Sequence, residues 1–241
     1  TERKWHSLVK SETKTIIANN HKNYIDSLKG IACFMVMFGH FLGILRYAEN
    51  FPANNTITNF FKSNFSFFLN ESFWLYLFFI VSGYLLAMSP CRDLKNVLTK
   101  SIKRFFRLGI PILFAYIIIF VIYKTIGFHN GETISLFNNA WYQNAYDGSY
   151  TVLDVLISPF DVLILSKTKM NTPYWVLREM FFSSIYIYVY SFIRTKLPQK
   201  NIVLCLSDVI ALCITYPSQI TFSCFFGVIA AYYEPQIKKI F

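Results

Sequence analysis

Residues 24–45 read YIDSLKGIACFMVMFGHFLGIL and form the strongest structural signal in the chain. The run is almost wholly apolar, and about 20 such residues are enough for a helix to cross the hydrocarbon core of a bilayer. Only a few polar groups interrupt it, among them Lys29 and His40. The stretch therefore predicts a membrane-spanning helix that carries two ionisable side chains.

Lys29 and His40 are eleven residues apart. In a helix that spacing leaves them only about 20° apart around the axis and about 16 Å apart along it. An ionisable residue inside a membrane helix costs about 2.5–3.5 kcal/mol or more and usually marks a functional site. Two structural alternatives are open, because Lys29 can extend to the headgroups and His40 can hydrogen-bond to a neighbouring helix.

Composition places the chain among membrane proteins. It has 241 residues, of which 54% are hydrophobic and 15% charged, with a mean hydropathy of +0.39. The net charge of +10 would suggest nucleic acid for a soluble protein. Here the basic residues flank apolar runs, so we expect a lipid bilayer and no nucleic acid as the partner. The five cysteines have no metal-ligand spacing, and we expect no metal.

Further apolar runs predict an all-α integral membrane protein, a bundle of about six transmembrane helices. Asp208 lies inside one of the shorter runs, and a carboxylate there is either paired or functional. The predicted spans after the first are 73–89, 108–126, 174–193, 201–216 and 218–233.

Residues 92–107 are amphipathic and basic, which predicts a helix lying in the membrane interface. Arg104 and Arg107 share one face of that helix, and guanidinium groups bind phosphates through two hydrogen bonds. One interpretation is a binding site for a phosphorylated donor. The other is a cationic anchor on the cytoplasmic side.

The distribution of cations predicts the orientation. If residues 1–29, 92–107, 194–200 and 234–241 lie inside, they hold 17 of the 23 lysines and arginines. We therefore expect a multi-pass protein of the cell membrane with a cytoplasmic amino terminus, in which residues 1–23 form a basic arm near anionic lipid. A secretory signal over 1–45 is less favoured, because the apolar run is too long and has no small-residue cleavage site.

Residues 127–173 are predicted to be a long polar, aromatic-rich loop, which is either functional or an ordered outer cap. The next span begins with Trp175, Arg178 and Glu179. There an ion pair or carboxylate can orient a second substrate. Alternatively, Glu179 is a cap near the positive end of its helix.

Four short motifs follow one another along the chain. The first is Asp26-Ser27-Leu28-Lys29, followed by ten residues and His40, and it resembles the Asp-Gly-Leu-Arg, ten residues and His of the membrane acyltransferase-3 family. Ser27 replaces Gly and Lys29 replaces Arg, which keeps the charge but loses the planar donor fork. The other matches, in the family's order, are FFIVSGY at 78–84, RFFR at 104–107, and Trp175-Val176-Leu177-Arg178-Glu179 with Glu in place of Asp. For Ser82-Gly83 the physical interpretation is close contact between helices.

The resemblance implies an enzyme that moves an acyl group, most often acetyl, from acetyl-CoA to a hydroxyl of a cell-envelope or exported polysaccharide. It implies that Arg104 and Arg107, assisted by Lys29, bind the acetyl-CoA, which is a substrate and not a permanently bound cofactor. His40 is then the general base or the acyl carrier. Glu179 is expected to be the second catalytic residue, with Trp175 and Arg178 binding the acceptor.

The family usually has about ten spans, so residues 24–241 are expected to be an acyltransferase-3-like transmembrane domain whose carboxy-terminal part is missing, trimmed or divergent. Two other functions remain open. One is a transporter of a lipid or sugar, which would favour inverted halves with broken helices. The other is a degenerate, non-catalytic partner protein, which the replacement of Arg by Lys29 keeps open.

Overall fold

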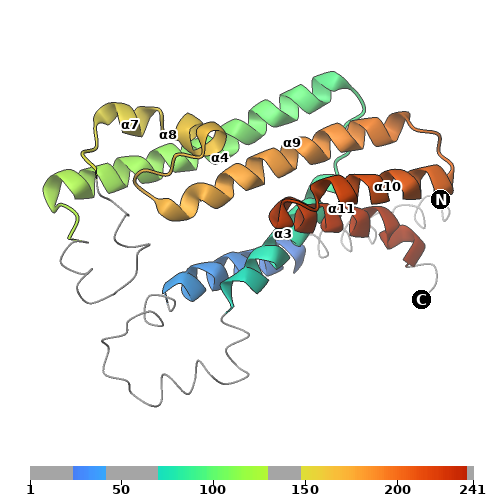
Figure 1. Cartoon of the computed structure of the whole chain (residues 1–241), viewed down its shortest axis with the longest axis horizontal. Helices are drawn as coiled ribbons and strands as arrows, with labels where there is room; N and C mark the ends of the chain where they lie inside the picture. Colours follow the sequence, from blue (N-terminus) through green and yellow to red (C-terminus); the bar gives the residue numbers. More distant parts are fainter. Residues whose placement is uncertain (1–23, 42–69, 130–147, 238–241) are drawn as a thin grey trace, which may run out of the picture.

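The computed structural model describes residues 24–41, 70–129 and 148–237, and every regular element within these ranges is a helix (Figure 1). The all-α prediction is therefore confirmed for this part of the chain. The long helices are residues 24–41, α3 (Glu71–Ala87), α4 (Leu94–Thr125), α9 (Trp175–Lys196), α10 (Asn201–Thr215) and α11 (Gln219–Ile237). The short ones are α7 (Val152–Leu156), α8 (Ser158–Phe160), the π-helix η2 (Asp161–Leu165) and the 3-10 helix η3 (Thr172–Tyr174).

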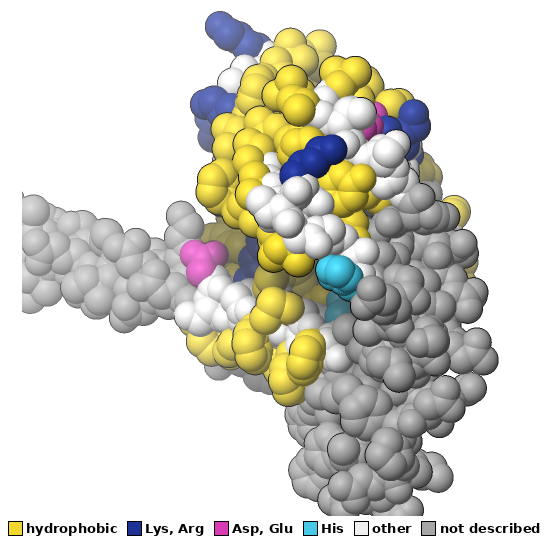
Figure 2. Space-filling model, turned by 90° about the vertical axis from the view of Figure 1, so that its left-hand side faces the viewer, with side chains coloured by type: hydrophobic (Ala, Val, Ile, Leu, Met, Phe, Trp, Pro, Cys, Tyr) yellow, Lys and Arg dark blue, Asp and Glu magenta, His cyan; other side chains and the backbone are white. Residues whose placement is uncertain are grey.

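Two stretches within the described ranges are long and apolar enough to cross a membrane, α4 and Thr172–Lys196; α3 and α10 are apolar but shorter. Much of the apolar surface faces outward, as at Ile110, Phe114 and Val121 of α4, which are 63%, 65% and 54% exposed. Figure 2 shows one end of the molecule, where hydrophobic side chains cover most of the described surface and charges are few. These features support association with a membrane, and the count of about six spans stays a prediction.

One boundary that we predicted is wrong. The basic stretch 92–107 and the span 108–126 are not separate elements, because α4 runs through both as a single helix of 32 residues. Pro111 lies inside it, and proline is tolerated in membrane helices because neighbouring groups satisfy the backbone carbonyl that it frees. A helix of this size is about 48 Å long, so its first turns extend past a hydrocarbon core of about 30 Å unless it tilts strongly.

Helices α3 and α11 are in the closest contact, at two glycines. A Cβ atom added to Gly83 would lie 1.7 Å from the carbonyl oxygen of Cys224, and one added to Gly227 would lie 1.8 Å from that of Ile80. Small residues allow helix backbones to approach in this way. The predicted structural role of Gly83 is confirmed.

We predicted that residues 127–173 form a long outer loop. This prediction is wrong for the part that follows residue 148. The ring of Tyr150 packs on Tyr123 at 5.1 Å, whereas Pro159 lies 3.1 Å from the Cβ position of Gly109. Along α4 those two contacts are about 21 Å apart. Residues 150–165 therefore re-enter the bundle beside α4 (Figure 1), with Val162 and Leu163 fully buried. Six other aromatic or acidic residues of this stretch lie outside the described residues: Glu132, Phe137, Trp141, Tyr142, Tyr146 and Asp147.

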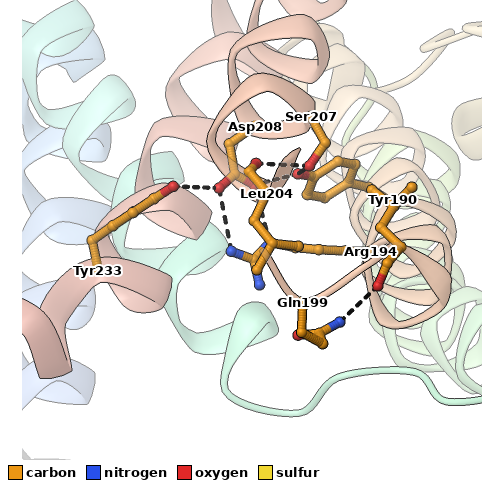
Figure 3. A network of polar contacts seen from close by, with 8 residues as sticks. Tyr190, Arg194, Gln199, Leu204, Ser207, Asp208 and Tyr233 are labelled. Atoms are coloured by element: carbon orange, nitrogen blue, oxygen red, sulfur yellow. Dashed lines mark hydrogen bonds and ion pairs between the residues drawn. The ribbon is translucent and has the colours of Figure 1, made fainter. Parts of the chain in front are cut away.

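Asp208 joins α9, α10 and α11 at one point (Figure 3). It is 2% exposed and accepts hydrogen bonds from Arg194 Nε at 3.1 Å, Arg194 Nη2 at 3.3 Å and the Tyr233 hydroxyl at 2.9 Å. The Tyr190 hydroxyl also donates to it, and the Arg194 guanidinium stacks 4.0 Å over Tyr232. Of the two alternatives that the sequence left open, Asp208 is the paired carboxylate.

Candidate functional site

Three cations that the sequence placed in different elements converge in the structure. Lys29 comes from the helix 24–41, and Arg104 and Arg107 come from α4. The charges of both arginines act on the Lys29 ammonium, which also lies 4.9 Å from the centre of the Phe78 ring of α3. The predicted donor-binding residues therefore form one cationic group, which we call the cationic cluster.

Arg104 is the buried member of the cationic cluster. It is 8% exposed, and its Nε has no hydrogen-bond partner among the residues that the structure describes. Its neighbours include Tyr188 of α9 and Cys224 of α11, and none of the ion pairs in the described ranges includes it. Because an unpaired buried charge is costly, this guanidinium is suited to receive an anion. Arg107, one turn further on, is exposed.

His40 lies on the same helix as Lys29. Residues 24–41 are helical throughout, so the predicted separation of about 20° around the axis holds. The buried positions Ile25, Ala32 and Gly39 mark the packed face of this helix, and His40 is an exposed residue at the edge of that face. Within the described ranges His40 makes no hydrogen bond or ion pair. The chain that follows it, residues 42–69, lies outside the described residues.

Trp175, Arg178 and Glu179 form a second group in the first turns of α9. Arg178 Nη1 is 3.3 Å from Glu179 Oε1, and the guanidinium carbon lies 5.1 Å over the Phe182 ring. Trp175 is 46% exposed. The predicted ion pair is therefore present. Tyr188, which adjoins Arg104, comes nine residues after Glu179, so this group and the cationic cluster are about 14 Å apart along α9.

The comparisons with known proteins agree with the motifs. A family model described as an acyltransferase domain, that of the acyltransferase-3 family, matches residues 22–239. The chain belongs to the acyltransferase-3 family. No curated protein and no solved structure matches the chain. All the candidate residues of this acyltransferase lie inside the matched range.

One contact of Glu179 in this acyltransferase could not be predicted from the sequence. Ser218 donates a hydrogen bond to Glu179 Oε2 at 3.3 Å and accepts one from the backbone N–H of Thr221, at the start of α11. A serine directly before an apolar run is a recognised signal for a helix start, and that signal was present in Pro217-Ser218. The contact with Glu179, 39 residues away in sequence, had no signal.

Glu179 does not cap its own helix, the structural alternative that we had left open. Helix α9 begins four residues earlier, at Trp175, and the second carboxylate oxygen of Glu179 points to the start of α11 instead.

For metal ions, no group of three or more potential ligands comes together in the described ranges.

Proposed function

We propose that this membrane acyltransferase moves an acetyl group from acetyl-CoA to a hydroxyl of a cell-envelope or exported polysaccharide. The observation that supports the donor is the cationic cluster, in which buried Arg104 has no carboxylate partner in the described ranges while Lys29 and Arg107 lie beside it. CoA carries several phosphates, and arginine binds phosphate through paired hydrogen bonds. The donor would enter from the cytoplasmic side, where the basic first turns of α4 extend.

His40 is the proposed base. An imidazole accepts a proton at neutral pH, so it would take the proton of the acceptor hydroxyl while the oxygen attacks the acetyl carbon. The bond to sulfur then breaks, and CoA leaves as a thiol after taking up a proton. A transient acetyl-imidazole is the alternative route. His40 is about 16 Å along the helix from Lys29, and the long pantetheine arm of CoA likewise separates the thioester from the phosphates.

The acceptor is expected at the other group of residues. Trp175 offers an exposed aromatic face, and Arg178 and Glu179 offer a hydrogen-bond donor and an acceptor side by side. A polyhydroxylated chain would approach this group from the outer side of the membrane. This arrangement belongs to a multi-pass protein with a cytoplasmic amino terminus.

The test uses the purified chain in detergent, with labelled acetyl-CoA and a glycan panel analysed by mass spectrometry. We expect His40→Ala to reduce acetyl transfer by about 100-fold or more and to keep the thermal stabilisation by CoA. His129→Ala is the matched control, a histidine outside the candidate site, and it should leave acetyl transfer unchanged. Arg104→Ala should abolish the stabilisation by CoA, whereas Lys103→Ala, an exposed neighbour on the same helix, should not.

Wild-type rates in the His40 variant would end the assignment of the base. A chain that neither binds CoA nor transfers acetyl would favour the non-catalytic alternatives.

A further inference from the structure

The carboxylate of Glu179 is engaged on both oxygens. Oε1 faces Arg178 Nη1 at 3.3 Å, and Oε2 accepts the hydrogen bond from Ser218 at 3.3 Å. A general base needs an oxygen directed at the proton that it removes. In this structure each oxygen instead holds a neighbouring side chain, one from its own helix and one from the start of α11.

Ser218 is fixed from several directions. Its Oγ accepts from the Thr221 N–H at 3.3 Å and lies 3.0 Å from Thr221 Oγ1, and its carbonyl oxygen accepts from the Phe222 N–H at 2.8 Å. Thr221 Oγ1 is in turn 3.0 Å from Ser183 Oγ of α9, and Ser183 is 1% exposed. A chain of hydroxyl groups therefore ties the start of α11 to α9 beside Glu179.

The chain of hydroxyl groups holds Arg178 in place through Glu179. Its Nη1 is used by Glu179, and the guanidinium is stacked over Phe182. Its Nε is buried and has no hydrogen-bond partner in the described part of the chain. Because 38% of the side chain as a whole is exposed, N–H groups at the other end of the guanidinium can reach an oxygen atom of a ligand. The charge of Arg178 is offset by Glu179, so the pair has no net attraction for an anion.

We propose that Ser218 is a positioning residue that holds Glu179, and through it Arg178, for binding an uncharged, polyhydroxylated acceptor. In this arrangement Glu179 acts by orientation and does not take the proton. The inference rests on the proposed acetyl transfer, and it adds the class of acceptor and the role of Ser218.

The experiment measures acetyl transfer by the full chain to two neutral oligosaccharides, cellopentaose and chitopentaose, and to pentagalacturonate. We expect transfer to a neutral chain and little transfer to the anionic one. Ser218→Ala should raise the KM for the neutral acceptor about tenfold or more, because about tenfold is the low end of the loss for a hydrogen bond to a charged group, with kcat changed less than threefold. Ser218→Thr, which keeps the hydroxyl, should restore the KM.

Two variants separate positioning from a folding defect. Ser223→Ala makes the same change on α11 at a hydroxyl that, among the described residues, bonds only to the Gln219 carbonyl of its own helix, and should leave the KM unchanged. Ser218→Gly keeps a favourable helix start but removes the hydroxyl, so it should match Ser218→Ala.

The role of the Glu179 carboxylate is tested separately. Glu179→Gln should raise the acceptor KM while the pH profile of kcat keeps its shape.

The inference is overturned if Ser218→Ala and Ser223→Ala have the same KM, if only pentagalacturonate is acetylated, or if Glu179→Gln loses about 100-fold in kcat together with one limb of the pH profile. A wild-type chain that acetylates none of the three acceptors, and none of the wider panel, would instead contradict the proposed function.

Discussion

At the level of single residues, two buried charges differ in their partners. Asp208 is satisfied by Arg194, Tyr190 and Tyr233, as buried charges in structural roles usually are. Arg104 is almost as deeply buried, but its Nε has no partner in the described ranges. We interpret the first as part of the scaffold and the second as part of a binding site.

The ion pair between Lys169 and Asp154 gives a prediction about pH. The hydrogen bond from Lys169 at 2.5 Å, and then those from Thr151, lower the pKa of Asp154 to about 2. The unfolded chain titrates near pH 3.9, so this pair stabilises the fold above about pH 4 and the effect is lost as the pH falls towards 2. Melting temperatures of wild type and Asp154→Asn should therefore differ at pH 6 and converge at pH 2. An unchanged difference across that range would contradict the assignment.

At the level of helices, close backbone contact does what hydrophobic burial does in water-soluble proteins. Lipid is as apolar as a leucine side chain, so helices in a bilayer associate through packing and hydrogen bonds. Helices α3 and α11 use Gly83 and Gly227 for packing, and hydrogen bonds from Tyr76 to Gln219 and from Tyr84 to Glu234 join the pair at either end. The FFIVSGY motif thus supplies both a helix contact and, through Phe78, a neighbour of Lys29.

Gly83→Ala tests that contact. The new Cβ would collide with backbone, the Cys224 carbonyl oxygen at 1.7 Å, which cannot rotate away. We expect a loss of about 1–3 kcal/mol, as for overpacked cores. Gly30→Ala is the matched control, because nothing lies within 4 Å of its Cβ position, and it should stabilise the chain by about 0.5–1 kcal/mol. Equal thermal stability of the two variants in detergent would contradict the contact.

The junction of α9, α10 and α11 gives another prediction. Asp208→Leu would leave Arg194 partly buried without its carboxylate, and breaking a buried pair in this way costs about 3–5 kcal/mol. Adding Arg194→Met removes the orphaned charge and should recover much of the loss. Thermal unfolding of the single and double variants measures the difference. A double variant less stable than Asp208→Leu alone would show that the ion pair does not account for the junction.

At the level of the whole molecule, the two candidate groups occupy different depths of one bundle. The cationic cluster lies near Tyr188, and the pair of Arg178 and Glu179 lies about 14 Å away along α9. A transferase that joins a cytoplasmic donor to an external acceptor requires such a separation. The distance between the two groups serves such a transfer only if the two ends of α4 face opposite sides of the membrane.

The orientation is tested with one introduced cysteine at a time, after the exposed Cys33, Cys205 and Cys213 are replaced by serine. A membrane-impermeant maleimide should label Lys167→Cys in intact cells and Lys103→Cys only after permeabilisation, because both positions are exposed and cations favour the cytoplasmic side. Native Cys91 and Cys224 are buried and should react slowly. The opposite order of labelling would place the amino terminus outside and reverse the proposed path of the donor.

Much of this protein could be read from local patterns. Apolar runs predicted a helical membrane protein, and the spacing of Lys29 and His40, with the RFFR and FFIVSGY motifs, predicted the family. These properties depend on hydrophobicity, helical period and motif order, all of which a linear chain displays. The convergence of Lys29 with Arg104 and Arg107 could be expected only through the resemblance, because the residues lie in separate elements.

The remaining features depend on contacts between residues far apart in sequence. A separate span was predicted to begin at residue 108, but α4 continues through this point and through Pro111. The re-entry of residues 150–165 depends on Gly109 accepting Pro159, and the state of Asp208 depends on Arg194 and Tyr233 from other helices. Likewise, only packing decided that Glu179 meets Ser218 while Arg104 meets no carboxylate in the described ranges. Local hydrophobicity determines that a segment enters the bundle. How the helices pack against one another determines which residue each polar group contacts.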